Sequence, residues 1–139
     1  MKWVKLRDDA IIPTRATEHS AGYDFYAAET VRIMPGEVKV VPTGITFEGM
    51  EADEFLQLSL RSGVSIKRPF LLANGVGIVD SDYADQEIGI ILFNRSQNIP
   101  AVVDKGERIA QGVILKYYTA EGEKKPTRKR TGGYGSTGN

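Results

Sequence analysis

The candidates for catalysis in this chain are carboxylates, because its 139 residues include no cysteine and a single histidine, His19. A thiol nucleophile, a zinc ribbon and a disulfide framework are therefore excluded, and a Ser-His pair nearly so. Asp80 and Asp82 follow an apolar, glycine-containing run in the segment 74–83. A carboxylate is the natural general base for activating water in such a chain. The same pair is also compatible with a divalent-cation site or an ordinary polar turn.

Two segments have the composition of phosphate-binding sites. Arg61, Ser62 and Gly63 follow an alternating run, and an arginine with a hydroxyl at a strand exit suits a phosphate group. Segment 132–138 surrounds Tyr134 and two hydroxyls with glycines, whose backbone N–H groups can face an anion. It lacks the Lys-Ser/Thr ending of a P-loop. Each segment alone is equally typical of a turn or a flexible linker.

The elements that must position these residues are short β-strands separated by turns. The chain has 15 glycines and 6 prolines, which recur at intervals along it. Residues 55–60 alternate between leucines and other side chains, and 88–93 and 113–115 are apolar runs of strand length. No stretch has sustained helical periodicity. The pattern predicts an all-β fold, a jelly-roll-like β-sandwich or barrel.

Charge and composition divide the chain into two parts. The 18 Lys and Arg balance the 18 Asp and Glu, which argues against a general nucleic-acid binder, but 116–130 holds a strong basic excess. We predict a core at 1–119 and a mobile C-terminal arm at 120–139 that carries the glycine-rich segment as a lid. No apolar run approaches the roughly 20 residues that span a bilayer, and 1–5 has no signal-peptide core. We therefore expect a cytoplasmic protein.

Taken together, five segments resemble the five ordered motifs of the trimeric deoxyuridine triphosphate nucleotidohydrolases, the dUTPases. The matching segments are 21–24, 61–63, 74–83, 106–111 and 132–138. The match at 74–83 is the most specific. The resemblance implies a jelly-roll fold and a homotrimer whose active sites are each built from motifs of all the subunits. A threefold arrangement would place the tail of one chain over the pocket of a neighbour.

The resemblance implies hydrolysis of dUTP to dUMP and pyrophosphate, which excludes uracil from DNA and supplies dUMP for thymidylate synthesis. Asp80 would be the catalytic base that activates water for attack on the α-phosphorus. Asp24 and Asp82 would be supporting residues that orient groups around the triphosphate. Mg²⁺ would be held by the triphosphate and water, without a direct protein ligand.

The resemblance also assigns roles in substrate binding. Backbone of the 74–79 hairpin would read the uracil edge, Tyr83 would pack under the deoxyribose and exclude a 2′-hydroxyl, and Tyr134 would stack on uracil. Gly135 and the two hydroxyls after it would bind the γ-phosphate. The full set of implied substrate-binding residues is Arg61, Ser62, Gly63, Asn74, Gly77, Ile78, Val79, Tyr83, Gln111, Arg128, Lys129, Arg130, Tyr134, Gly135, Ser136 and Thr137.

The sequence departs from the family pattern mainly in the tail. Tyr134 stands where the family usually has phenylalanine. The family's tail arginine aligns with Lys129 and the glycine after it with Arg130. Arg128 or Arg130 could supply the guanidinium for the γ-phosphate, or Lys129 could act as a point charge. The turn after Tyr83 is one residue longer than usual, which predicts a bulge or a wider turn.

Two other functions remain compatible with such a fold. A dCTP deaminase-like enzyme would share it, but the sequence Asp80-Ser81-Asp82-Tyr83 and the tail motif favour the hydrolase. A non-catalytic jelly-roll trimer that binds nucleotides or a protein partner is the second alternative. The intact candidate base, Asp80, argues against it.

Overall fold

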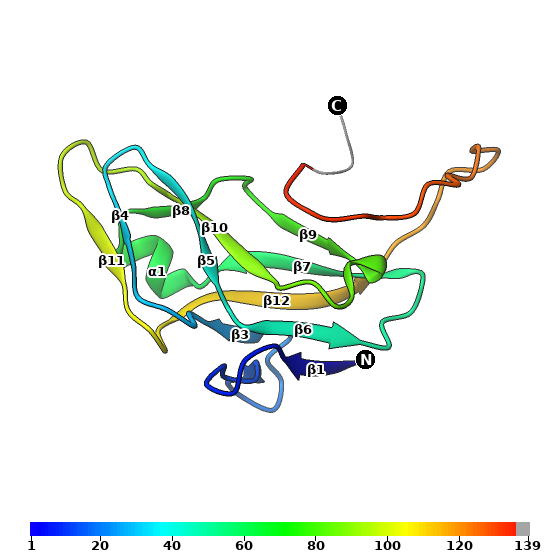
Figure 1. Cartoon of the computed structure of the whole chain (residues 1–139), viewed down its shortest axis with the longest axis horizontal. Coiled ribbons are helices and arrows are strands. Elements are labelled where there is room, and N and C mark those ends of the chain that lie inside the picture. The colour runs from blue at the N-terminus through cyan, green and yellow to red at the C-terminus, as the bar shows by residue number, and fades with distance from the viewer. Residues whose placement is uncertain (136–139) are drawn as a thin grey trace.

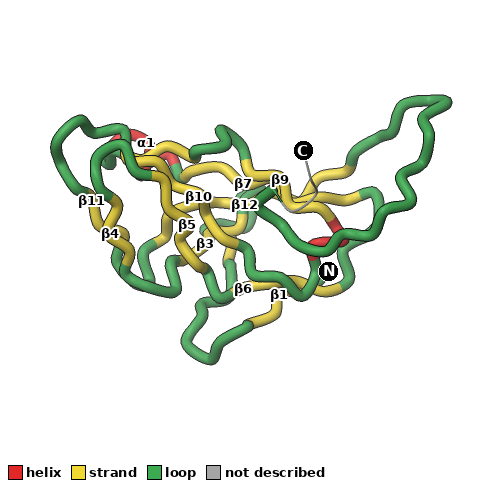
Figure 2. Tube along the Cα trace, turned by 45° about the horizontal axis from the view of Figure 1, so that its top comes forward, coloured by secondary structure: helices red, strands yellow, loops and turns green. Residues whose placement is uncertain are grey.

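The computed structural model describes residues 1–135 (Figure 1). Within that range the chain consists of short strands joined by loops, with helix only in α1 (Ser62–Lys67) and in the 3-10 helix η1 (Ser81–Tyr83) (Figure 2). The prediction of an all-β, jelly-roll-like fold is confirmed. The described sheets are open, so the fold is a sandwich rather than a closed barrel.

The largest sheet supplies most of the residues of interest. Its antiparallel strands follow the order β2 (Thr14–Arg15), β3 (Tyr23–Tyr26), β12 (Arg108–Lys116), β7 (Glu54–Leu60) and β9 (Gly77–Asp80). The alternating segment predicted at 55–60 lies in β7, where Leu56 and Leu58 are buried and their neighbours are partly exposed. This alternation arises because successive strand side chains point to opposite faces. β9 pairs only with β7 and is an edge strand of the sheet.

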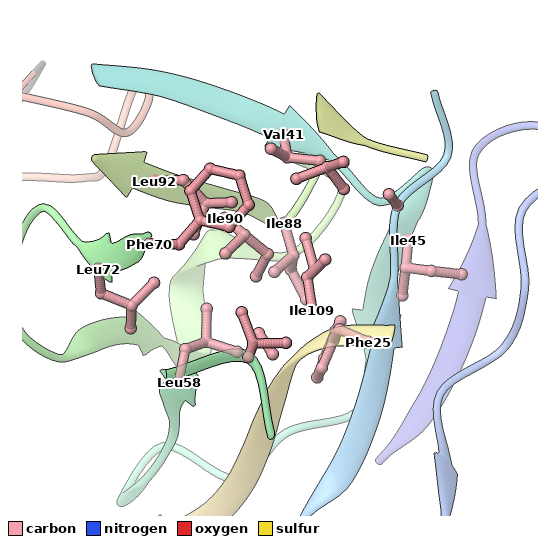
Figure 3. Packing of buried hydrophobic residues seen from close by; sticks show 14 of the residues in the cluster. Phe25, Val41, Ile45, Leu58, Phe70, Leu72, Ile88, Ile90, Leu92 and Ile109 are labelled. Carbon is pink, nitrogen blue, oxygen red and sulfur yellow. The ribbon is translucent and has the colours of Figure 1, made fainter. Parts of the chain in front are cut away.

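Three smaller antiparallel sheets complete the described fold. They are β5 (Val38–Pro42), β10 (Gly89–Asn94) and β8 (Phe70–Leu72); β1 (Lys2–Lys5) with β6 (Ile45–Glu48); and β11 (Ala101–Val103) with β4 (Val31–Ile33). Side chains from both larger sheets meet in one core (Figure 3). Phe25, Val41, Phe70, Ile90 and Ile109 are fully buried there. Each such side chain contributes roughly 1.5–3 kcal/mol by leaving water.

The three-stranded sheet has an apolar outer face. Val38 and Val40 of β5 and Leu71 of β8 are exposed at 51%, 45% and 43%. They lie around β10, because Val40 pairs with Ile91, while Val38 and Leu71 both pair with Phe93. Such a contiguous apolar face is typical of a surface that another protein covers.

The tail begins where β12 ends at Lys116. Residues 117–135 contain no helix or strand. Figure 1 shows this segment leaving the end of β12 and returning across β9. In this single chain the tail therefore lies over its own hairpin, whereas the sequence led us to expect it over a neighbour's pocket. No helix in the described part of the chain has the length and hydropathy needed to cross a membrane.

Candidate active site

Residues 74–80, which run from the turn after β8 into β9, line one pocket. β8 and β9 belong to different sheets and do not pair with each other, so the predicted hairpin is a turn that connects two sheets. We keep the names hairpin for this segment and hairpin pocket for its pocket. Gly75 has a φ of +71° at its turn, a conformation that glycine adopts without strain. The edge of β9 that faces away from β7 has no strand beside it among the described residues, so its backbone groups are open to a ligand. The pocket encloses about 200 Å³. Eight of the predicted site residues line it: Asn74, Gly77, Ile78, Val79, Asp80, Tyr83, Arg130 and Tyr134.

Asp80 is the last residue of β9, immediately before η1. Its side chain is half-exposed at the edge of this pocket. Tyr83 is buried beneath the same pocket, and its hydroxyl donates a hydrogen bond of 3.0 Å to the carbonyl oxygen of Glu87. The turn that follows contains Asp85 at a φ of +66°, which is a left-handed conformation that Asp tolerates better than most residues.

The glycine-rich tail packs directly on this hairpin. A Cβ added to Gly133 would lie 2.5 Å from a ring carbon of Tyr83, so only glycine fits there. The hydroxyl of Tyr134 comes against the backbone of Gly89, at the start of β10. Burial, with Tyr83 nearby, raises the pKa of Tyr134 above its ordinary value. The tail therefore covers the pocket formed by the hairpin.

Arg130 connects the tail to both acidic residues of the predicted site. Its Nε donates a hydrogen bond of 2.6 Å to Asp82 Oδ1, and its Nη2 donates to Asp80 Oδ2. The guanidinium lies 5.9 Å from the centre of the Tyr83 ring. Only 17% of the Arg130 side chain is exposed. The hydrogen bond to Asp82 raises the pKa of Arg130 above its usual value.

A second pocket, of about 350 Å³, is lined by residues of β3, β7 and β12 in the same sheet. Asp24, Gln111 and Ser59 occupy facing positions on β3, β12 and β7, and Arg61 follows two residues after Ser59. Because strand side chains alternate, these residues share one face. Ser62, the first residue of α1, also lines this pocket, and Gly63 follows it in the helix. A Cβ on Gly22 would lie 2.8 Å from Gln111 Oε1, so glycine leaves room for that amide.

Asp24 holds two arginines in this region. Its side chain is 8% exposed, forms an ion pair of 2.9 Å with Arg61 Nε and accepts a hydrogen bond of 3.2 Å from Arg108 Nη1. Asp24 therefore orients Arg61 and has little freedom for other chemistry. Arg108 was absent from the predicted site residues. Its pairing with Asp24 joins residues 84 apart in the chain, and no local sequence pattern indicates such a contact.

The remaining predicted residues lie in the tail. Arg128, Lys129 and Arg130 line a shallow pocket beside Asp82. Gly135 is the last residue described, with a φ of +96°. Ser136 and Thr137, which were predicted to bind the γ-phosphate, lie outside the described residues.

The two pockets share no lining residue. β9 and β12 flank β7, and the residues facing Asp80 and Gln111 on β7 are Phe55 and Ser59, four positions apart. Strand spacing and rise then place Asp80 and Gln111 roughly 16 Å apart. Within residues 1–135 no three acidic or histidine side chains cluster in a way that could hold a metal ion.

A family model for dUTPase matches residues 8–138 of this chain. The chain belongs to the dUTPase family. This confirms the resemblance that the five segments indicated. Segments 21–24, 61–63 and 106–111 each contribute residues to the second pocket, and 74–83 contributes to the hairpin pocket, which Gly133 and Tyr134 of the fifth segment also line.

Known dUTPases resemble the chain in both sequence and fold. A deoxyuridine 5'-triphosphate nucleotidohydrolase of Lactococcus lactis is 45% identical over 132 residues, covering 91% of this chain and 87% of that protein. A Streptococcus mutans dUTPase superposes with a TM-score of 0.79 at 32% identity, covering 88% of this chain and 100% of that one. A variant dUTPase from phage phi11 of S. aureus gives a TM-score of 0.78 at 26% identity, covering 91% and 96%. That structure is described as revealing the coordination of a structural Mg(II) ion.

Proposed function

We propose that the chain hydrolyses dUTP to dUMP and pyrophosphate, with Asp80 as the general base. The observation that best supports this proposal is the position of Asp80, half-exposed at the end of the open edge strand that lines the hairpin pocket. Its relatives bear the name of the same activity. The reaction removes dUTP as a source of uracil in DNA and supplies dUMP for thymidylate synthesis. We place this activity in the cytoplasm.

Uracil would bind along the open edge of β9. Backbone groups from Asn74 to Val79 present donors and acceptors in a fixed order, and a cytosine in their place would leave buried polar groups unpaired. Tyr83 would lie under the deoxyribose, with its ring held by the bond to the Glu87 carbonyl, and would leave no room for a 2′-hydroxyl. Tyr134 would close over the base as an aromatic cover.

The chemical step begins with a water molecule hydrogen-bonded to Asp80. The carboxylate takes a proton as the water oxygen bonds to the α-phosphorus, and the bond from that phosphorus to the bridging oxygen breaks. Pyrophosphate leaves with the electron pair of this bond. Such a base is expected to contribute about 10²–10⁴-fold to the rate.

The phosphates would be held by the residues of the second pocket. Arg61, Ser62, Gly63 and Gln111 supply a guanidinium, a hydroxyl, backbone N–H groups and an amide. Asp24 keeps Arg61 in place. From the tail, Gly135, Ser136 and Thr137 would contact the γ-phosphate, together with a cation from Arg128, Lys129 or Arg130.

We propose that Mg²⁺ is the cofactor and that the triphosphate, with water, provides its ligands. Asp80 and Asp82 are both engaged by Arg130, which fits a metal held by the substrate rather than by these carboxylates. The ion would neutralise phosphate charge. Chelation with EDTA should abolish most turnover, and added Mg²⁺ should restore it.

The active site would form between subunits of a homotrimer. Asp80 and the phosphate pocket are roughly 16 Å apart in one chain, which is too far for the attacked α-phosphorus to reach both. A neighbouring chain would bring its phosphate pocket to the hairpin. The apolar outer face of β5, β10 and β8 supports such an assembly, because a second copy would remove it from water.

A substrate panel tests the proposed reaction. The protein is incubated with Mg²⁺ and dUTP, dCTP, dTTP or UTP, and both pyrophosphate and ammonia are measured. Pyrophosphate from dUTP alone is the expected result. Ammonia from dCTP would instead indicate a deaminase, and the absence of turnover on every nucleotide would indicate a binding protein.

A further inference from the structure

The turn between Tyr83 and β10 is held from outside by the segment that leads into β6. Glu87 is half-buried at the end of this turn, and its Oε1 accepts a hydrogen bond of 2.6 Å from the backbone N–H of Gly44. The next residue, Ile88, donates its N–H to the carbonyl oxygen of Ile45 at 2.8 Å. One side-chain bond and one backbone bond therefore attach the end of the turn to the start of β6.

Gly44 is a rigid partner for the Glu87 carboxylate. Its φ is +66°, and an added Cβ would lie 2.7 Å from Arg7 Cγ and 2.8 Å from Ala10 Cβ, so a side chain there would be strained and crowded. Its carbonyl oxygen accepts a hydrogen bond of 2.8 Å from the N–H of Leu6. The packing around Gly44 thus fixes the direction of its N–H, and the charge of the acceptor strengthens the bond.

Glu87 also holds Tyr83, through its own backbone. Its carbonyl oxygen accepts the hydrogen bond of 3.0 Å from the Tyr83 hydroxyl. The position of this oxygen depends on how the end of the turn is attached, since the turn itself contains Asp85 in the left-handed conformation and Gln86, which is partly exposed. Release of the Glu87 carboxylate would therefore allow both the carbonyl oxygen and the tyrosine ring to move.

We propose that Glu87 is a positioning residue that enables the site to distinguish deoxyribose from ribose. Its carboxylate, bonded to Gly44, keeps its own carbonyl oxygen in place, and that oxygen keeps the Tyr83 ring where a 2′-hydroxyl would collide with it. A collision discriminates only while the group that causes it cannot move aside. The inference rests on the proposed position of the deoxyribose against Tyr83.

Calorimetry with dUTP and UTP in the presence of EDTA measures this discrimination without turnover. The quantity of interest is the Kd for UTP divided by the Kd for dUTP, which should be large in the wild-type protein. In Glu87→Ala it should fall about tenfold, the scale of one lost hydrogen bond to a charged group. In Glu87→Gln, whose amide oxygen can still accept from Gly44, it should stay within about threefold of wild type. Both nucleotides carry the same triphosphate, so the effect of the lost charge cancels in the ratio.

Tyr83→Phe tests whether Glu87 acts through Tyr83. This variant retains the ring but has no hydroxyl to donate to the Glu87 carbonyl, so it should lower the ratio by a similar factor. Combining it with Glu87→Ala should lower the ratio no further, because both changes interrupt the same connection. Thermal unfolding verifies that the variants are folded. If Glu87→Ala does not fold, Tyr83→Phe decides, and an unchanged ratio in that variant would overturn the proposal.

Glu37→Ala is the matched control. Glu37 also accepts a hydrogen bond of 2.8 Å from a backbone N–H, that of Met34, but its turn between β4 and β5 lies far from β9 (Figures 1 and 2). Its replacement should leave the ratio unchanged. An equal fall in this control, an unchanged ratio in Glu87→Ala or a wild-type ratio near one would each contradict the proposal. A wild-type protein that prefers dUTP but does not hydrolyse it with Mg²⁺ would refute only the proposed reaction.

Discussion

At the level of single residues, two carboxylates have opposite environments and hence different uses. Asp80 is half-exposed at a pocket, where water can reach it. Asp24 is almost buried and is bonded to Arg61 and Arg108. A carboxylate with two guanidinium partners is poorly placed to accept a proton from water. Asp80 is therefore the candidate base, whereas Asp24 is placed to orient Arg61.

Replacing Asp80 by Asn tests this assignment. The amide is nearly isosteric but cannot take a proton, so kcat should fall at least about 10²-fold. The Kd for dUTP should change less than about threefold, because the hairpin backbone is retained. Pyrophosphate release and calorimetry give the two quantities. The control is Asp53→Asn, which alters an exposed carboxylate paired with Lys116 and should leave both kcat and the Kd for dUTP unchanged. Equal loss of binding and turnover would make Asp80 structural.

Replacing Asp24 by Asn should act through the arginines. An uncharged amide weakens two charge-assisted bonds, so the free energy of unfolding should drop by about 1–3 kcal/mol. The loosened Arg61 should raise KM for dUTP more than it lowers kcat. Chemical denaturation and initial rates measure the two effects. An unchanged KM with lowered stability would restrict Asp24 to the fold.

At the level of elements, local patterns predicted some of the structure and missed contacts between distant segments. The alternation at 55–60 predicted β7, and the absence of helical periodicity agrees with a single α-helix of six residues in the described chain. Residues 61–63 follow the end of β7, as predicted, but the sequence did not predict the helix that begins at Ser62. The bridge from Arg130 to Asp80 spans 50 residues, and only the fold brings those residues together. Such contacts depend on tertiary packing rather than on local propensity.

Deleting residues 131–139 tests the tail as a cover. The deleted tail residues that the structure describes pack on the hairpin rather than in the core, so thermal unfolding and particle mass should match those of the full chain. Loss of Tyr134 and the glycine-rich segment should lower kcat/KM by about 10²-fold or more, since a closed site excludes water and aligns the phosphates. A truncated protein that fails to fold would contradict the division into core and cover.

At the level of the whole molecule, two incomplete pockets lie on one sheet. The residue types of each pocket were recognisable from motifs, but their separation was not, because it depends on strand order and register. The order β2-β3-β12-β7-β9 places β9 at one edge of the sheet and the facing residues Asp24, Gln111 and Ser59 near its centre. A nucleotide that contacts both pockets at once would therefore have to bind between two chains, as we propose.

Mixing two inactive variants tests the shared site. Asp80→Asn retains the phosphate pocket, and Arg61→Ala retains the base. If sites form between neighbours, trimers reassembled from equal amounts should regain about a quarter of wild-type activity, because one site in four combines both intact halves. Pyrophosphate release after denaturation and joint refolding measures this. Each variant refolded alone is the control, and no recovery in correctly sized mixed trimers would place the whole site within one chain.

The separation of the two pockets also has a consequence for how much enzyme a cell must hold. If the site forms between subunits, as we propose, a dissociated chain would hold both half-sites but no complete site. Turnover per chain would then depend on the total amount of protein, and would fall on dilution below the dissociation constant of the assembly. Synthesis that doubles the number of chains would then more than double the capacity to clear dUTP. With a shared site, the register of a single sheet would make the abundance of the protein a determinant of its specific activity.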